Sequence, residues 1–177
     1  GLGGRWPTRR EPDAGSVMML TFKRIRYLFH CDSHGNMVRR VSVRGSNAGT
    51  IIGTMKPKGY LVAVVDGKMY RVHHLVWFWH HGSWATELDH RNRIRHDNRI
   101  ENLRLCTHTQ NLGNMRPRVH QYKGVTFCKS TSRWRAQITV NYSHVCLGRH
   151  DTIEDAARAY NQAARDHFGE FAQLNDV

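Results

Sequence analysis

The sequence predicts an α+β fold made of two small domains. Its 177 residues leave room for one medium domain or two small ones, and hydrophobic residues make up 40%, enough for two modest cores. Strand-like alternation occurs on both sides of a stretch rich in Gly, Asn, Pro and Arg, and helical spacing follows it in each half. We expect the following segments: a flexible leader or cloning remnant at 1–18, a first domain at 19–115, a linker at 116–121 and a second domain at 122–177.

The first domain is expected to mix short helices with short strands. A helix, a region of strands and turns, a hairpin and a second helix are predicted at 20–29, 37–54, 60–72 and 73–81, in that order. The hairpin is predicted because Asp66-Gly67 supplies the positive φ angles of a two-residue turn between two apolar runs. Gly82 is expected to end the second helix.

The second domain is expected to pack a three-stranded antiparallel sheet on one helix. Alternating patterns predict strands at 124–127, 134–140 and 144–147. A helix is predicted from Thr152, because carboxylates fill its first turn and small apolar residues then recur every three or four positions; Gly169 is expected to end it.

The charge of the chain points to a polyanionic partner. Lys and Arg number 27 against 14 Asp and Glu, a formal net charge of +13, which favours nucleic acid because neutralised phosphates release counterions. No stretch approaches the roughly 18 apolar residues of a membrane span, so no membrane partner is expected. The four cysteines form no C-x-x-C pair, which argues against a zinc ribbon and fits a reducing cytoplasm.

The most informative segment is 87–111. Leu88-Asp89-His90 is predicted to end a short strand, 101–105 to form a second strand after a polar loop, and Thr107 to cap a helix that carries Asn111. Phosphodiester hydrolysis needs a base to activate water and positive charge at the phosphate and at the departing oxygen. A histidine suits the first task, and a hard divalent cation held by carboxylate and amide oxygens suits the second.

This segment resembles the ββα-metal motif of HNH endonucleases, in the subclass common among phage and intron homing enzymes. The residues that carry the resemblance are Asp89-His90, then Asp97-Asn98-Arg-Ile-Glu-Asn102-Leu-Arg, then Asn111; segments 59–60, 66–68 and 72–77 are also similar. The resemblance extends over about residues 20 to 115 and implies an HNH nuclease domain. Asn98 could equally be a turn residue, and His80, His81, His96 and His108 match no family position and are interpreted as solvated or DNA-facing.

The resemblance also implies roles for individual residues. His90 would be the general base that activates water, and Asn102 would brace the loop so that His90 points correctly. Asp89 and Asn111 would hold Mg²⁺ or Mn²⁺, because an Asn in place of the family's final His favours a hard, oxygen-ligated ion. His73 would lie near the site and contact phosphate.

Residues 122–175 resemble the AP-two (ethylene-response-factor type) DNA-binding domain. The resemblance rests on Tyr122-Lys-Gly-Val, Trp134-Arg-Ala-Gln-Ile, Leu147-Gly148, the helix from Thr152 and the segment 168–175. It implies a sheet that lies in the major groove. Alternation along the middle strand places side chains suited to phosphates and base edges on one face, with further backbone contacts nearby. The expected DNA-binding residues are Lys123, Lys129, Arg133, Arg135, Gln137, Thr139 and Arg149.

Taken together, the sequence predicts a metal-dependent HNH endonuclease of homing or phage type that binds double-stranded DNA. We expect 3′-hydroxyl and 5′-phosphate ends, one nick per active site, a monomer or homodimer, and the cytoplasm of a phage-infected or bacterial cell. One alternative is a DNA-binding regulatory protein with a catalytically silent HNH fold, which would need a defect among the motif residues. A second, an RNA-binding accessory protein, rests on charge alone.

Overall fold

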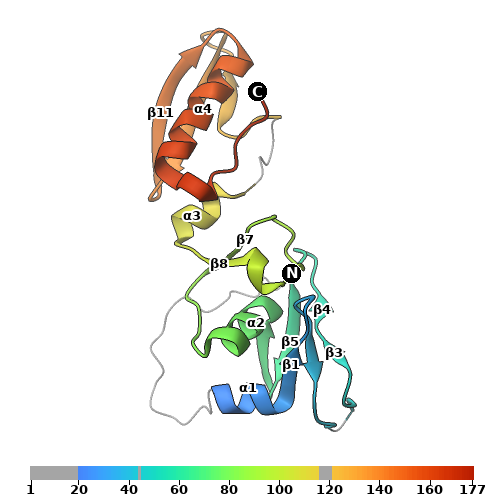
Figure 1. Cartoon of the computed structure of the whole chain (residues 1–177). Helices are drawn as coiled ribbons and strands as arrows, with labels where there is room; N and C mark the ends of the chain where they lie inside the picture. Colours follow the sequence, from blue (N-terminus) through green and yellow to red (C-terminus); the bar gives the residue numbers. More distant parts are fainter. Residues whose placement is uncertain (1–19, 44, 116–120) are drawn as a thin grey trace.

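The computed structural model describes residues 20–43, 45–115 and 121–177. The expected leader at 1–18, and the expected linker except for Gln121, lie outside these residues. Figure 1 shows a mixed N-terminal part, a short helix α3, and a C-terminal sheet and helix. In chain order the elements are α1 (Phe22–Leu28), β1 (Phe29–Cys31), β2 (Met37–Arg39), β3 (Ile51–Ile52), β4 (Thr54–Met55), β5 (Leu61–Val65), β6 (Lys68–Arg71), α2 (Val72–His81), β7 (Leu88–His90), η1 (Ile100–Asn102), β8 (Leu103–Leu105), α3 (His108–Gly113), β9 (Val125–Cys128), β10 (Arg133–Val140), β11 (Ser143–His150), α4 (Ile153–Phe168) and η2 (Gly169–Phe171).

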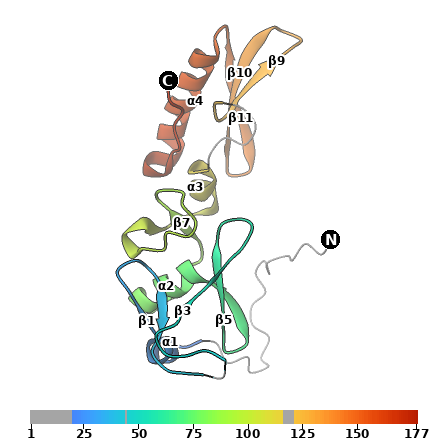
Figure 2. The same ribbon diagram turned by 90° about the vertical axis from the view of Figure 1, so that its right-hand side faces the viewer.

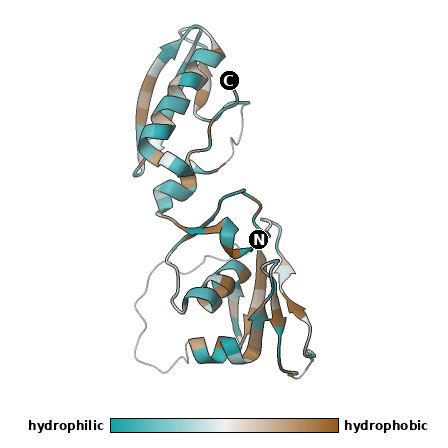
Figure 3. Ribbon diagram, viewed as in Figure 1, coloured by the Kyte–Doolittle hydropathy of each residue, from teal (hydrophilic) through white to brown (hydrophobic). Residues whose placement is uncertain are grey.

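The N-terminal part packs two small antiparallel sheets and two helices around one hydrophobic core. The sheets have the strand orders β1–β2–β3 and β4–β5–β6. Strand β5 is mostly brown in Figure 3, in line with its burial at Val62, Ala63 and Val65. Helix α2 contributes Leu75 and Val76, both fully buried, to the same core. The core therefore fixes α2 and the hairpin that precedes it.

Turn chemistry explains the hairpin and the end of α2. Asp66 and Gly67 have φ of 47° and 76°, the left-handed pair that a tight hairpin turn requires, so the predicted hairpin is confirmed. Gly82 has φ of 70° and its N–H bonds to the carbonyl of Phe78, which ends α2 at the predicted residue. Helix α1 is shorter than expected, because Phe29 is extended and begins β1.

A strand pair and a short helix follow. Strands β7 and β8 are antiparallel, and the segment before β8 is the 3-10 turn η1, so the second strand begins at Leu103 and not at Glu101. Thr107 caps α3 as predicted, and Gln110 completes a capping box by bonding back to the Thr107 backbone N–H.

The C-terminal part is a three-stranded antiparallel sheet, ordered β11–β10–β9, packed on α4 (Figure 2). Ala136 and Ile138 of β10 face Ala156, Ala157 and Ala164 of the helix, and these five side chains are buried. Small residues on α4 let the helix approach the sheet closely. The predicted fold class, α+β with this sheet on one helix, is confirmed.

Helix α3 contacts both parts of the molecule. A Cβ atom on Gly113 would lie 2.7 Å from Cγ of Phe168, so the end of α3 touches α4 where only glycine fits. The backbone N–H of Gln173 donates to the carbonyl of Gly113 at 3.0 Å. None of the helices among the described residues is long and apolar enough to cross a membrane.

Candidate functional site

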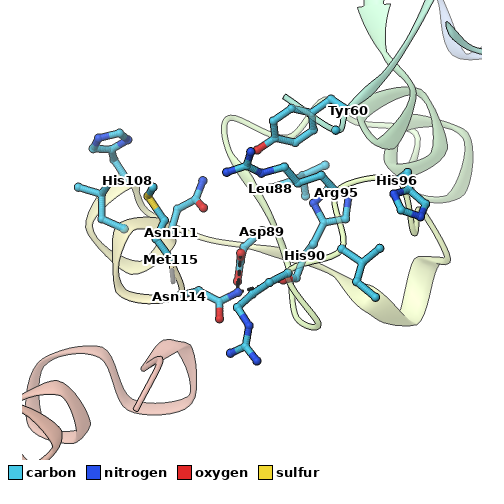
Figure 4. A pocket seen from close by; sticks show the side chains of 14 residues that line it. Tyr60, Leu88, Asp89, His90, Arg95, His96, His108, Asn111, Asn114 and Met115 are labelled. Carbon is cyan, nitrogen blue, oxygen red and sulfur yellow. Dashed lines mark hydrogen bonds between the residues drawn. The ribbon is translucent and has the colours of Figure 1, made fainter. Parts of the chain in front are cut away.

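A pocket of about 730 Å³ lies where β7, the loop after it and α3 meet (Figure 4). Asp89 and His90 reach it from β7, and Asn111 reaches it from α3. The complete lining is Gly59, Tyr60, Leu88, Asp89, His90, Arg93, Ile94, Arg95, His96, His108, Asn111, Leu112, Asn114 and Met115. The predicted base and the two predicted metal ligands thus line one pocket.

The imidazole of His90 is held by Asn98. His90 Nε2 lies 3.2 Å from Asn98 Oδ1, and Asn98 is 1% exposed. The amide oxygen only accepts, so Nε2 carries the proton and Nδ1 keeps a lone pair. Burial lowers the pKa of His90, while the hydrogen bond with Asn98 opposes that effect. The ring is therefore neutral near pH 7, the state that a general base needs.

The two carboxylate oxygens of Asp89 have different surroundings. Arg104 lies opposite Asp89 across the β7–β8 pair; its Nε donates to Oδ2 at 2.9 Å, and its Nη2 forms an ion pair with the same oxygen at 2.8 Å. Asn114 Nδ2 donates to Oδ1 and Oδ2 at 2.9 and 3.0 Å and to the carbonyl of His90 at 2.9 Å. Oδ2 thus accepts two hydrogen bonds and lies in an ion pair with Nη2, whereas Oδ1 accepts one hydrogen bond, which leaves Oδ1 with lone-pair capacity for a further partner.

Asn111 is oriented by Glu87. Asn111 Nδ2 donates to Glu87 Oε1 at 2.7 Å, which fixes the direction of the amide. Within the described part of the chain, Asn111 Oδ1 has no hydrogen-bond partner, so it can serve as an oxygen ligand in the pocket.

Asn102 ties the loop together. Its Oδ1 accepts from the backbone N–H of Asn92 at 3.0 Å, and its Nδ2 donates to the carbonyl of Asp97 at 2.7 Å. The side chain spans the loop that carries Asn98, which fits the bracing role expected for it. Asp97, whose carbonyl Asn102 holds, directly precedes Asn98, the residue that bonds to His90.

His73 packs behind His90. The two rings lie 4.9 Å apart, edge to face, and His73 is 1% exposed. Burial lowers the pKa of His73 well below its ordinary value, and its Nδ1 is buried without a hydrogen-bond partner. His73 is thus buried and is not among the residues that line the pocket, and the phosphate contact expected from sequence stays a prediction. Its ring packs against the ring of His90, the predicted general base.

The oxygen atoms in the pocket suit a hard divalent cation. Asp89 Oδ1 and Asn111 Oδ1 are the ligand types that Mg²⁺ and Mn²⁺ accept, and Mg²⁺ usually keeps several waters. No group of three or more His, Cys, Asp or Glu among the described residues could hold a metal ion. An ion held by these two oxygen atoms would take its remaining ligands from water and a phosphate. Arg93 and Arg95 also line the pocket and would provide positive charge for that phosphate.

The exposed face of the C-terminal sheet carries most of the predicted DNA-binding residues. Arg135 faces Arg149 across β10 and β11, Gln137 faces Cys146, and Thr139 faces His144. Arg135 and Arg149 are exposed, and neither forms an ion pair with any residue that the structure describes. Two adjacent unpaired guanidinium groups suit phosphates or guanine edges.

Three predicted DNA contacts lie elsewhere or are already paired. Arg133 forms an ion pair with Asp151 at 3.0 Å, and Lys129 is exposed in the turn between β9 and β10. Lys123 is not on the exposed face: its Nζ donates to the carbonyls of Leu112 and Gly113 at the end of α3. The side chain is partly buried between the two parts of the chain, where it satisfies carbonyls that the helix end leaves open.

Sequence reasoning missed four supporting residues. Glu87, Asn98, Arg104 and Asn114 each bond to a predicted site residue. Two signals could have found them: Asn114 lies one helical turn after Asn111, and antiparallel pairing of the two short strands brings Arg104 opposite Asp89.

Two families of known proteins match separate segments of the chain. The family described as HNH endonuclease matches residues 70–112, and the AP2 domain family matches residues 120–169. The residues before 70 that also resembled the nuclease lie outside the first match.

Curated relatives match about a third of the chain. APETALA2-like protein 2 from Oryza sativa subsp. indica is 45% identical over 60 residues, 34% of this chain and 14% of that protein. The AP2-like ethylene-responsive transcription factor TOE2 from Arabidopsis thaliana is 44% identical over 62 residues, 35% of this chain and 13% of that protein. The chain thus spans about one seventh of the length of these relatives. No solved structure matches the chain.

Proposed function

We propose that this chain, in which an HNH endonuclease domain is followed by an AP2 DNA-binding domain, is a metal-dependent endonuclease that hydrolyses DNA phosphodiester bonds. The observation that carries the proposal is the meeting of Asp89, His90 and Asn111 in one pocket, with the base fixed by Asn98. We assign the enzyme to the homing or phage type.

The residues of the pocket divide the chemistry among them. Asp89 Oδ1 and Asn111 Oδ1 would hold Mg²⁺ or Mn²⁺, which supplies positive charge at the scissile phosphate and at the departing oxygen. Asn114 and Arg104 keep the Asp89 carboxylate in place, and Glu87 does the same for the Asn111 amide. Partners of this kind typically matter about 10- to 100-fold for metal affinity or activity.

His90 supplies the proton transfer. Nδ1 accepts a proton from water, and the water oxygen attacks phosphorus as the bond from phosphorus to the 3′ oxygen breaks. The products carry a 3′-hydroxyl and a 5′-phosphate. Arg93 and Arg95 at the pocket would bind the DNA backbone next to the cut.

The AP2 sheet would hold the duplex. Arg135, Arg149 and Gln137 lie on its exposed face and suit phosphates and base edges in the major groove. One nuclease domain engages one strand at a time, so a nick is the expected product of one encounter. A cut through both strands would need a homodimer or a second encounter.

The test is cleavage of supercoiled plasmid in Mg²⁺, in Mn²⁺ and in EDTA. Wild type is compared with His90→Ala and with His81→Ala, an exposed histidine outside the pocket that serves as the matched control. We expect metal-dependent open-circle or linear DNA from wild type and control, and none from His90→Ala, which still binds DNA. Binding without cleavage under every metal, on DNA that contains the target, would instead identify a DNA-binding regulator with a silent HNH fold.

A further inference from the structure

One buried side chain connects the Asp89 carboxylate to the C-terminal domain. Arg104 donates through Nε to Asp89, with which its Nη2 forms an ion pair, and through Nη1 to the backbone carbonyl and the carboxylate of Glu170, both at 3.1 Å. Its guanidinium carbon lies 3.8 Å from the centroid of the Phe171 ring. Glu170 and Phe171 form η2 with Gly169, directly after α4.

Both edges and one flat face of the Arg104 guanidinium group make contacts. One edge faces the carboxylate, the Nη1 nitrogen faces η2, and the flat face covers an aromatic ring. Arg104 is only 8% exposed, so solvent does not compete strongly for these contacts. A planar fork of five donors can serve all three partners together, whereas a lysine ammonium cannot.

Further contacts hold the same two parts together. Arg91, in the loop that follows β7, pairs with Glu170 at 3.1 Å. Phe168 packs on Gly113 at the end of the helix that carries Asn111. Asn111 therefore lies on a helix that the C-terminal domain contacts, and Asp89 lies on β7, the strand that pairs with β8, which carries Arg104. Glu170 and Phe171 lie just beyond residue 169, the last residue of the AP2 match.

We propose that Arg104 is a positioning residue for the metal-binding carboxylate and that η2 of the C-terminal domain holds it in place. The inference rests on the proposed function. By occupying Oδ2 of Asp89 with a hydrogen bond and an ion pair, Arg104 would leave Oδ1 to serve as the ligand of the ion. The DNA-binding domain thereby completes the catalytic centre of the nuclease domain.

The test measures Mn²⁺ binding to the full chain, from the electron paramagnetic resonance signal of free Mn²⁺. Arg104→Lys keeps the positive charge next to Asp89 but loses the fork, and we expect its dissociation constant for Mn²⁺ to rise about 10-fold. Phe171→Leu leaves the Asp89 side of Arg104 intact and alters its far side together with the core of the C-terminal domain, and we expect a smaller, several-fold rise. Phe127→Leu, the same substitution in the same domain, should bind Mn²⁺ as wild type does. The Mn²⁺ concentration for half-maximal plasmid nicking should rise most for Arg104→Lys, less for Phe171→Leu and not at all for Phe127→Leu.

The double variant tests the connection. If Phe171 acts through Arg104, Phe171→Leu changes nothing further in the Arg104→Lys protein. Additive effects would overturn the proposed path across the domains. Thermal unfolding distinguishes a positioning role of Arg104 from a role in stability. If the variants have a lower Tm but bind Mn²⁺ with wild-type affinity, the role of Arg104 is purely structural. If the wild type binds Mn²⁺ and nicks DNA and both variants do so equally well, this inference is overturned but the proposed function is not. A wild type that neither binds Mn²⁺ nor nicks overturns the proposed function as well.

Discussion

At the scale of single residues, the readiness of His90 to act as a base depends on its neighbour Asn98. The amide oxygen of Asn98 holds the proton on Nε2, and burial keeps the ring neutral near pH 7. A histidine that is neutral and fixed in one tautomer presents Nδ1 to accept a proton without first changing its state. Asn98 is itself buried, so its position is set by the loop around it.

We predict that Asn98→Ala slows plasmid cleavage at saturating Mn²⁺ by about 10²-fold, the lower end of what a positioned general base contributes. The ring would lose the acceptor that selects its tautomer, while the sheet that is proposed to bind DNA stays unchanged. Single-turnover cleavage and gel-shift affinity measure the two effects separately. Asn47→Ala, at an exposed turn, is the control and should cut at the wild-type rate. An Asn98→Ala enzyme of full activity would show that the tautomer is set elsewhere.

The sequence could name the residues that do chemistry more readily than those that support them. Asp89, His90 and Asn111 are spaced in a recognisable motif, and the pocket brings them together. Asn98 read equally well as a turn residue, because its role depends on a contact eight residues back in the chain. Lys123 looked like a phosphate ligand, yet it bonds to the end of α3, and nothing in its local pattern indicates that helix.

At the scale of elements, the loop between β7 and η1 is ordered by one carboxylate. Asp97 accepts from Arg99 Nε and Nη2 at 2.8 and 2.7 Å and from Asn92 Nδ2 at 2.6 Å. The hydrogen bonds from Arg99 hold the pKa of Asp97 well below its usual range. The stabilisation by this carboxylate is therefore complete above the unfolded pKa, near 3.9, and is lost as pH falls toward the folded value.

Asp97→Asn removes this pH-dependent stabilisation, so we expect the Tm of the variant to lie below wild type at pH 7. The difference in Tm should stay constant down to about pH 5 and then shrink as the wild-type carboxylate becomes protonated. Thermal unfolding of both proteins from pH 7 to pH 3 measures it. Asp166→Asn, an exposed carboxylate on α4, should show no comparable trend. A difference that is independent of pH would mean that the charge of Asp97 does not stabilise the loop.

The contact of α3 with α4 leaves no room for a side chain at Gly113. A Cβ there would lie 2.7 Å and 2.9 Å from two ring atoms of Phe168, a buried residue. Alanine favours a helix by about 1 kcal/mol over glycine. Overpacking costs about 1–3 kcal/mol, so Gly113→Ala should lower the free energy of unfolding. Urea unfolding tests this, and Phe168→Leu in the same chain should recover part of the loss. A more stable single variant would mean that the ring moves aside freely.

Elements with strong local signals were predictable from sequence. The Asp66-Gly67 turn fixed the first hairpin, and the small-residue spacing of α4 fixed the helix under the C-terminal sheet. Strand β1 was not predicted, because its three residues are too few to show alternation. The second strand of the site also begins later than expected, since Glu101 and Asn102 belong to a 3-10 turn whose polar side chains give no periodic signal.

At the scale of the whole molecule, most of the net charge of +13 lies in the first domain: residues 19–115 hold 15 Lys and Arg against 6 Asp and Glu, whereas residues 122–177 hold 7 against 6. Net charge alone therefore does not identify the sheet of the second domain as a surface that meets DNA. Arg135 and Arg149 are distinguished by position: they face each other on the exposed side of the sheet, with no carboxylate partner among the described residues. Placing two like charges together is unfavourable unless a polyanion separates them. Arg158, by contrast, lies on α4 behind the sheet and pairs with Asp155 at 2.7 Å.

These positions predict a difference in salt dependence. A phosphate contact by Lys or Arg adds about 0.9 to the slope of log affinity against log salt concentration. Arg135→Ala and Arg149→Ala should each weaken duplex binding and reduce the size of that slope by about 0.9, the value for one phosphate contact. Arg158→Ala should change neither the affinity nor the slope. Fluorescence anisotropy with a labelled duplex between about 50 and 200 mM salt, in EDTA to prevent cleavage, measures affinity and slope together. Equal weakening by Arg158→Ala would mean that the total charge of the protein, and not the face of the sheet, holds the DNA.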